Sequence, residues 1–211
     1  MDAVSLLGSL LGVAFLSGVR LYSTVFAIGL ALRLHWIELP ASLAPLDVLA
    51  SGPILLLAGA LYLIEFVADK VPLVDTLWDA VHTFIRPFGA AILAAVALGP
   101  VDPVVRVAAI LICGTVALSG HTAKAATRVA VNHSPEPFSN IGVSLGEDLL
   151  VVAGLWLAVN HPVITLVSVI VIFAAIVWFV PKVLRALWRS AKGVLQVVRG
   201  KAAPATASTA G

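Results

Sequence analysis

Long apolar segments, separated by short polar or proline-containing stretches, dominate the chain. The pattern predicts six such segments, at residues 4–34, 48–68, 81–98, 104–132, 142–160 and 162–181. Most of them have the roughly 20 residues that a helix needs to cross the hydrocarbon core of a bilayer. Apolar residues follow one another without alternation, which favours helices over the strands of a membrane barrel. The pattern therefore predicts an all-α, polytopic bundle of membrane helices.

The first and fourth segments are too long for one straight crossing, because a helix rises about 1.5 Å per residue. Each contains a Leu-Ser-Gly step, at Leu16–Gly18 and at Leu118–Gly120. We expect the helix to break at Ser17-Gly18 in the first segment and at Ser119-Gly120 in the fourth.

A second similarity links residues 57–62 with residues 152–156, so the halves 1–99 and 100–190 resemble a degenerate repeat of three segments each. An odd number of crossings per half would place the halves in opposite orientations, which is the inverted repeat of many transporters. The alternative is that each long segment forms a tight, re-entrant helical hairpin.

Composition supports the membrane class, since 61% of the residues are apolar and 11% are charged. A soluble domain carries about 25% charged residues. A soluble chain of this size could not bury so much apolar surface in one core, whereas lipid can cover it. Backbone groups in lipid must satisfy their own hydrogen bonds, as helices do.

Basic residues gather near the end of the chain, at Lys182, Arg185, Arg189, Lys192, Arg199 and Lys201. The positive-inside rule places this end in the cytoplasm, where it can also contact anionic lipids. Nucleic acid is not expected as a partner. Residues 191–211 are predicted to form a basic and then disordered tail. Six crossings would place both termini in the cytoplasm. The first helix is expected to remain in the mature protein, because no basic region of a signal peptide precedes it.

A first cluster of ionisable residues follows the second apolar segment: Glu65, Asp69, Lys70, Asp75, Asp79, His82 and Arg86. Charged side chains at membrane depth cost about 2.5–3.5 kcal/mol each on insertion scales, so each needs an explanation. The last four are spaced by four, three and four residues and share one helical face. That face is interpreted as the solvent side of an interfacial helix, as a solute pathway, or as part of an ion-pair network.

A second cluster, His121, Lys124 and Arg128, also shares one helical face. Like charges at this spacing repel unless an anion or a carboxylate lies between them. Glu147, Asp148 or the first cluster are the candidates for that carboxylate, and an anionic site is the alternative.

Arg20 lies in an otherwise apolar run, and a buried guanidinium needs a carboxylate or phosphate partner. Glu65, Glu147 and Asp148 are the candidate partners. A structural salt bridge and a functional role both remain open.

The stretch 132–140 holds two prolines and is predicted to be an extended loop, with Asn140 able to cap the next helix. This loop, which includes Glu136, is interpreted as a lid or as a simple connector.

Signatures of common enzymes are missing, among them His-Glu-x-x-His, Gly-x-Ser-x-Gly and the P-loop. The five histidines are scattered, and Cys113 is the only cysteine, in an apolar run. No catalytic residue, cofactor or metal site is therefore predicted, and a metal could bind only through tertiary contacts.

Several motifs resemble a bacterial membrane family known as domain of unknown function 4126. The residues that carry the resemblance are Ser17–Arg20, Glu65–Asp79, His82–Pro87, His121–Ala125, Ser134–Asn140 and Gly146–Asp148. The resemblance spans the chain from about residue 10 to about residue 185. It implies a multi-pass protein of the bacterial inner membrane and implies no activity.

The leading functional hypothesis is a small transporter or channel for a small ion or an anionic solute. Its polar centre is predicted to contain Arg20, Glu65, Asp69, His82, His121, Lys124, Arg128, Glu147 and Asp148. Lys70, Asp75, Asp79, Arg86, Glu136 and Asn140 are assigned to a secondary stripe and loop. A carboxylate of the polar centre could carry a proton, while the second cluster (His121, Lys124 and Arg128) binds an anion.

Two other classes remain open, a lipid-binding structural scaffold and a membrane enzyme that acts on a lipid head group. Membrane lipids are expected partners. A homo-oligomer is also open, because Gly8 and Gly12 lie four residues apart and could pack helices within or between protomers.

Overall fold

The computed structural model describes residues 2–132 and 137–201, and the regular elements of these residues are all helices. The all-α prediction is therefore confirmed. In chain order the elements are α1 (Ala3–Val19), α2 (Leu21–Arg33), the 3-10 helix η1 (Ala41–Ala50), α3 (Gly52–Ala68), α4 (Pro72–Ala97), α5 (Pro103–Asn132), α6 (Pro137–Asn160) and α7 (Pro162–Lys201).

Proline marks where four of these helices begin, at Pro72, Pro103, Pro137 and Pro162. The first turn of a helix has no use for the N–H group that proline lacks, and the fixed φ of proline suits the helix. One consequence is that α4 starts well before the predicted apolar segment 81–98 and includes the charged stripe.

Four helices of the described chain are long and apolar enough to cross a membrane, within α4, α5, α6 and α7. The pair η1 and α3, bent by 72°, counts as a fifth if it is one span, while α1 and α2 are shorter apolar helices. A helical membrane protein is thus supported, but six separate crossing segments are not found.

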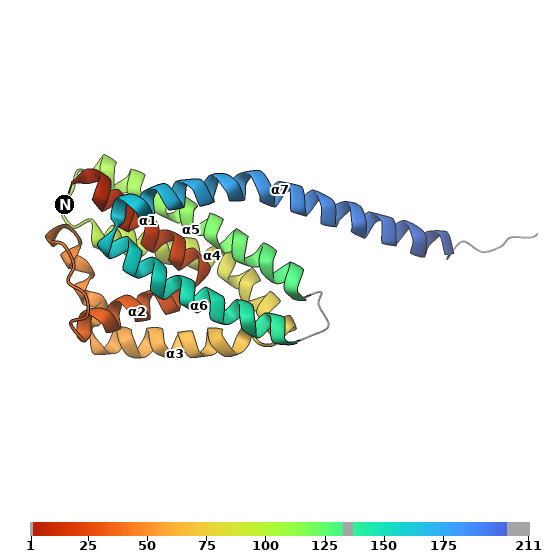
Figure 1. Cartoon of the computed structure of the whole chain (residues 1–211), viewed down its shortest axis with the longest axis horizontal. Helices are drawn as coiled ribbons and strands as arrows, with labels where there is room; N and C mark the ends of the chain where they lie inside the picture. Colours follow the sequence, from red (N-terminus) through yellow and green to blue (C-terminus); the bar gives the residue numbers. More distant parts are fainter. Residues whose placement is uncertain (1, 133–136, 202–211) are drawn as a thin grey trace, which may run out of the picture.

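The first predicted segment folds as a hairpin. α1 runs from the end labelled N into the bundle, and α2 returns towards that end (Figure 1). The chain leaves the helix at Arg20, which has φ −147° and ψ 92°, just after the predicted Ser17-Gly18 step. The alternative of a helical hairpin therefore describes this segment, and its re-entry into a membrane stays a prediction.

The predicted break in the fourth segment is wrong, because α5 runs unbroken through Ser119 and Gly120. Both Ser-Gly steps instead lie where α1 and α5 pack closely. A Cβ atom on Gly18 would lie 2.0 Å from the carbonyl oxygen of Ala117, and one on Gly120 would lie 2.7 Å from that of Phe15. These glycines are needed for close packing of two backbones.

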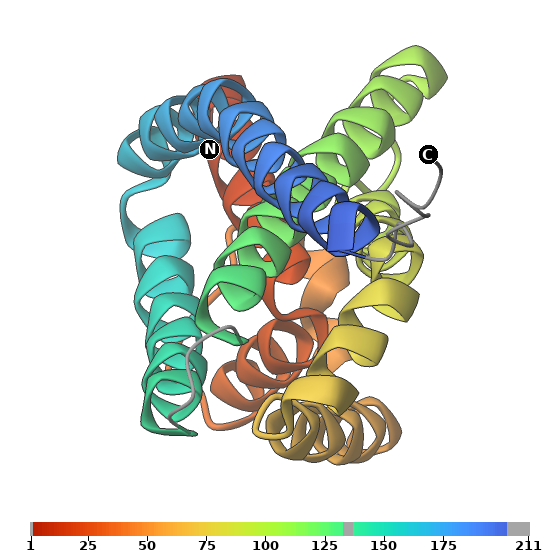
Figure 2. The ribbon, with the colours of Figure 1, turned by 90° about the vertical axis from the view of Figure 1, so that its right-hand side faces the viewer.

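α1 lies in the middle of the bundle and packs against α4, α5, α6 and α7 (Figure 2). Gly8 and Gly12 serve this packing, since added Cβ atoms would lie 2.0 Å from Pro162 O and 2.5 Å from Thr165 Cγ2 of α7. The two glycines therefore pack helices within the chain, and a homo-oligomer stays a prediction. Helices from both predicted halves contact α1.

α1 begins at one end of the bundle, and α7 leaves at the other end and extends beyond it (Figure 1). The described chain therefore starts and finishes at opposite ends of the bundle, and the cytoplasmic location of both termini stays a prediction. Residues 191–201 continue α7, and the rest of the predicted tail lies outside the described residues.

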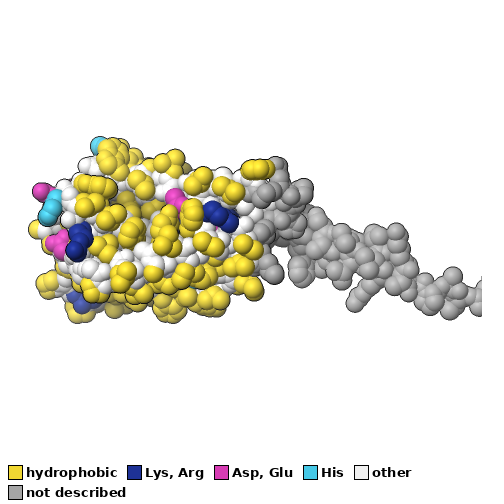
Figure 3. All heavy atoms as spheres, turned by 90° about the horizontal axis from the view of Figure 1, so that it is seen from below, with side chains coloured by type: hydrophobic (Ala, Val, Ile, Leu, Met, Phe, Trp, Pro, Cys, Tyr) yellow, Lys and Arg dark blue, Asp and Glu magenta, His cyan; other side chains and the backbone are white. Residues whose placement is uncertain are grey.

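The face of the bundle shown in Figure 3 is mainly apolar, and its charged atoms gather chiefly at one end. Leu56, Phe84 and Val104 are exposed by 77%, 70% and 76%. Exposed apolar side chains on this scale suit lipid rather than water.

Candidate functional site

Arg20 forms the tip of the α1–α2 hairpin. Its N–H group donates to Leu16 O at 2.8 Å, which closes α1. Its carbonyl oxygen accepts from Thr24 N at 3.0 Å and from Thr24 Oγ1 at 2.7 Å, which starts α2. The side chain of Arg20 is completely buried. The backbone therefore bends at a residue whose guanidinium reaches into the bundle.

The guanidinium of Arg20 binds carboxylates from two helices. It forms a short ion pair with Asp69 at the end of α3. Its Nε lies 3.1 Å from Glu147 Oε2, and its Nη1 lies 3.1 Å from Asp148 Oδ1, both on α6. Nη2 also donates to Ser144 Oγ at 2.7 Å. The hairpin tip is therefore held by α3 and α6.

The bases of α5 meet the same carboxylates. Lys124 Nζ lies 3.3 Å from Glu147, 3.4 Å from Asp69 and 3.7 Å from Glu65. Arg128 Nη2 lies 2.9 Å from Glu147 and 3.2 Å from Asp69. The carboxylates thus lie between two bases that are four residues apart and would otherwise repel.

The charged stripe of α4 faces inward, so the interpretation as a solvent-facing helix is wrong. Arg86 is completely buried, and its Nη2 lies 2.6 Å from Glu65 Oε1 while its Nη1 lies 3.1 Å from Asp79 Oδ1. Arg86 Nη1 also lies 2.7 Å from His121 Nδ1. A guanidinium can only donate, so His121 Nδ1 must accept.

This geometry assigns His121 as neutral, with its proton on Nε2. That nitrogen lies 3.0 Å from Thr83 Oγ1, which in turn donates to Asp79 O. The chain of donors from Arg86 to Asp79 is then complete without a charge on the imidazole.

His82 lies beside the ion pairs and contacts different groups. Its Nδ1 lies 2.8 Å from Trp78 O and therefore carries a proton, while its Nε2 lies 3.1 Å from the hydroxyl of Tyr22 on α2. The imidazole stacks on the Trp78 ring with centroids 4.4 Å apart. His82 thus links α4 to the second helix of the hairpin.

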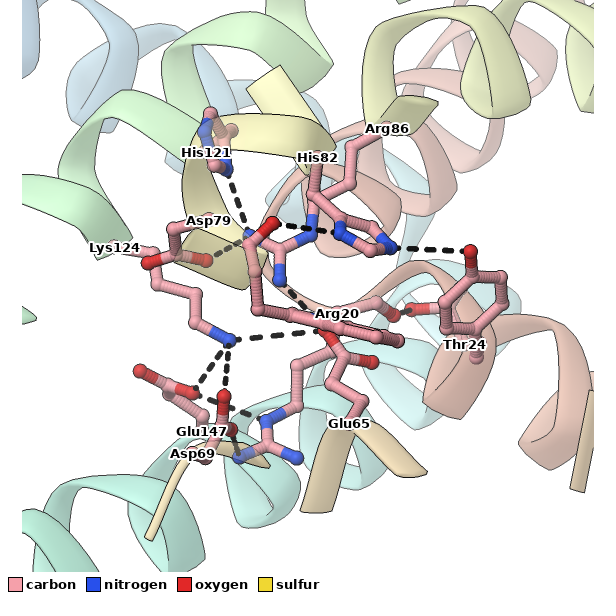
Figure 4. A network of polar contacts seen from close by, with 12 residues as sticks. Arg20, Thr24, Glu65, Asp69, Asp79, His82, Arg86, His121, Lys124 and Glu147 are labelled. Carbon is pink, nitrogen blue, oxygen red and sulfur yellow. Dashed lines mark hydrogen bonds and ion pairs between the residues drawn. The ribbon is translucent and has the colours of Figure 1, made fainter. Parts of the chain in front are cut away.

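The ion pairs join five elements into one cluster, shown from close by in Figure 4. We call this cluster the buried polar centre; it consists of Arg20, Glu65, Asp69, Asp79, Arg86, His121, Lys124, Arg128, Glu147 and Asp148. Taking charges out of water is costly, so each member depends on its partners. Asp79 and Arg86, which the sequence placed in a secondary stripe, belong to this centre.

The other predicted residues of the stripe and loop are not among the residues that define the buried polar centre. Lys70, at the α3–α4 turn, donates to Phe66 O at 2.9 Å and lies over the Phe66 ring. Asp75 is buried and acts electrostatically on Arg128.

Asn140, on α6, is buried, and its Oδ1 has no hydrogen-bond partner among the described residues. Glu136 lies outside the described residues. No group of three or more His, Cys, Asp or Glu in the described parts of the chain could hold a metal ion.

Two polar contacts of the centre and one contact of the neighbouring His82 were missed from the sequence. Ser144 binds Arg20, Thr83 binds His121 and Tyr22 binds His82. Ser144 lies three residues before Glu147, so the helical spacing of α6 places both on one face. That spacing is the signal that could have identified Ser144.

The sequence model of a domain of unknown function (DUF4126) matches residues 7–182. The match covers most of the chain, including every residue of the buried polar centre. The chain therefore belongs to this family. No match was found among curated proteins or solved structures.

Proposed function

We propose that this protein is a small membrane transporter that moves a proton through the buried polar centre. The observation that carries the proposal is a surplus of carboxylates in a site that is largely buried. The family assigns no activity, so the proposal rests on the charges and contacts of the centre.

The cations of the centre are Arg20, Arg86, Lys124 and Arg128. These four make ion pairs with five carboxylates, on Glu65, Asp69, Asp79, Glu147 and Asp148. An uncompensated charge in such surroundings costs several kcal/mol, on the order of the penalty for one buried ion. The surplus is removed if a carboxylate binds a proton or a small cation.

Glu65 is the carboxylate best placed to bind that proton. Its Oε1 accepts from Arg86 at 2.6 Å and lies 3.7 Å from Lys124. Its Oε2 is buried and has no hydrogen-bond partner among the described residues. A proton on Oε2 would neutralise Glu65 and leave the contacts of Oε1 in place.

The α1–α2 hairpin gives the site a means of access. Broken helices that meet inside the bundle build the ion sites of many transporters. The hairpin tip is joined to the carboxylates through Arg20, so a shift of the tip would change which carboxylates have a cation beside them.

An inverted arrangement of part of the chain supports the same class. The turn between α3 and α4 and the turn between α6 and α7 lie at opposite ends of the bundle (Figure 1). These two helix pairs thus run in opposite senses, as an inverted repeat requires. The unbroken α5 has no counterpart to the hairpin, so the three-plus-three repeat stays a prediction.

The ion pairs favour a proton over an anionic solute. Lys124 and Arg128, which the sequence assigned to an anion, are already bound to Asp69 and Glu147. An anion would have to displace carboxylates that are fixed to the chain. The same full pairing of cations makes a structural scaffold the second candidate.

The test is proton flux into liposomes that contain the purified protein and a pH-sensitive dye. A potassium gradient with valinomycin supplies the driving force. We expect wild-type protein to acidify the lumen. The Glu65→Gln variant should lose this flux, because a side-chain amide, unlike a carboxylate, does not bind and release a proton near neutral pH.

Glu38→Gln is the matched control, since Glu38 is exposed and lies outside the centre. Its flux should equal that of wild type. Thermal unfolding of each variant in detergent shows whether it is folded. Absence of flux from folded wild-type protein, or full flux from folded Glu65→Gln protein, would overturn the proposal and favour the scaffold.

A further inference from the structure

An apolar groove runs beside the buried polar centre. It has a volume of about 470 Å³ and lies between α1, α2 and α6, with η1 at one end. Phe26, Ala27 and Ala31 of α2 line one side, and Val152 and Trp156 of α6 line the other. Its volume falls in the range of about 300–1,000 Å³ that is usual for small-molecule sites.

The groove ends at a carboxylate. Asp148 is the one charged side chain among its described lining residues, and the Tyr62 hydroxyl interacts with it. The side chain of Asp148 is 19% exposed, and its inner side pairs with Arg20 at 3.1 Å. Arg20 is shared with Asp69 and Glu147, so it cannot fully neutralise Asp148.

We propose that this groove binds a lipophilic amine, with its protonated nitrogen on Asp148 and its apolar chain between α2 and α6. A cationic head complements the residual negative charge of Asp148. A fatty acid would place a second carboxylate beside Asp148, and a fatty alcohol would offer a hydrogen bond without charge. The apolar walls match a hydrocarbon chain.

Length and access fit such a ligand. Along α6 the groove extends from Asp148 to Val159, which is about 16 Å at the rise of a helix. Val152 and Trp156 are 62% and 57% exposed, so the groove is open on the lipid-facing side of the bundle. An amphiphile dissolved in the bilayer can therefore enter sideways.

The site is distinct from the proposed proton carrier Glu65, although Asp148 belongs to the buried polar centre. Binding is measured without flux, so a failure of proton transport leaves this inference standing. A failure of binding likewise leaves the proton proposal intact.

The experiment uses purified full-length protein in phosphatidylcholine nanodiscs. Quenching of tryptophan fluorescence is titrated with dodecylamine brominated in its chain, and with the alcohol and the carboxylate of the same brominated chain. Trp36 and Trp156 line the groove and report occupancy. We expect saturable quenching by the amine, at a concentration at least about tenfold lower than for the other two probes, as a charged hydrogen bond allows.

Two variants distinguish the contribution of the ligand's head group from that of its apolar chain. Asp148→Asn should weaken amine binding by about tenfold and leave the alcohol unchanged. Ala27→Phe fills the groove and should weaken all three probes. Asp47→Asn, an exposed carboxylate of η1, is the matched control and should bind the amine as wild type does.

Equal quenching of wild-type protein by all three probes would show a surface that merely contacts lipid, and it would overturn the proposal. So would an unchanged amine affinity in folded Asp148→Asn protein. If that variant fails to fold, the comparison of head groups on wild type and the loss in Ala27→Phe still decide the question.

Discussion

The tip of the α1–α2 hairpin and the middle of α5 carry the same Leu-Ser-Gly step but have different backbones. After Leu16–Gly18 the chain leaves the helix at Arg20, whereas after Leu118–Gly120 the helix continues to Asn132. In both places the glycine allows another helix to approach. The shared step therefore explains the packing and does not explain the break.

What differs is the polar residue that follows. Arg20 must reach Asp69 on α3 and Glu147 on α6 at once, and it does so from an extended backbone. Lys124 and Arg128 reach the same carboxylates from one face of a regular helix, because they lie four residues apart. The helix breaks at Arg20, where a single side chain joins two other helices. It continues in α5, where the spacing of Lys124 and Arg128 already brings both side chains to the carboxylates.

Among substitutions at the two Leu-Ser-Gly steps, Gly18→Val should lower the free energy of unfolding the most. The new Cβ would lie 2.0 Å from the backbone carbonyl oxygen of Ala117, so α1 and α5 must move apart. We expect a loss of at least about 3 kcal/mol in the free energy of unfolding, at the upper end for overpacking. Unfolding by SDS in mixed micelles, followed by tryptophan fluorescence, measures it.

Gly146→Val is the control for helix propensity, because a Cβ at Gly146 meets no atom within 4 Å. Its effect should stay below about 1 kcal/mol. Similar losses in both variants would mean that the contact between α1 and α5 does not decide stability at Gly18.

Gly120→Ala should have an intermediate effect. Its Cβ would lie 2.7 Å from the carbonyl oxygen of Phe15, which is closer than real contacts allow but less severe than at Gly18. We expect a loss of about 1–2 kcal/mol in the same assay. Gly142→Ala, in open space on α6, should lose nothing. A neutral Gly120→Ala variant would show that α5 can shift at no cost.

Much of the fold could be predicted from the sequence, since continuous apolar runs permit only helices in lipid. Prolines occupy the first position of α4, α5, α6 and α7, and a proline at this position is a signal of a helix start that a sequence does contain. The path of the first and fourth segments could not be predicted, because a glycine that bends a helix and a glycine that admits a neighbour look alike in one sequence.

The residues of the buried polar centre could largely be named from their cost in a membrane, and part of their pairing could be predicted too, since Glu147 and Asp148 were candidate partners of Arg20. Asp69 was not expected as the partner of Arg20, and Arg86 was not expected beside His121. Such pairs depend on which helices lie side by side. Spacing within one helix, as for Lys124 and Arg128, can be taken directly from the sequence, whereas a contact between helices can only be proposed as one of several candidates.

The smallest effects should come from the two serines of the repeated step, and they should have opposite signs. Ser17 Oγ is buried without a hydrogen-bond partner among the described residues, whereas Ser119 Oγ donates to Val116 O at 2.7 Å. Ser17→Ala removes an unsatisfied hydroxyl and should stabilise the protein by about 1 kcal/mol. Ser119→Ala loses a hydrogen bond and should cost about 0.6 kcal/mol, the mean for such bonds in membrane helices. SDS unfolding of both variants beside wild type checks the signs. A loss of stability in Ser17→Ala would mean that the Ser17 hydroxyl has a hydrogen-bond partner. The hairpin tip would then be held by a polar contact of Ser17 as well as by the ion pairs of Arg20.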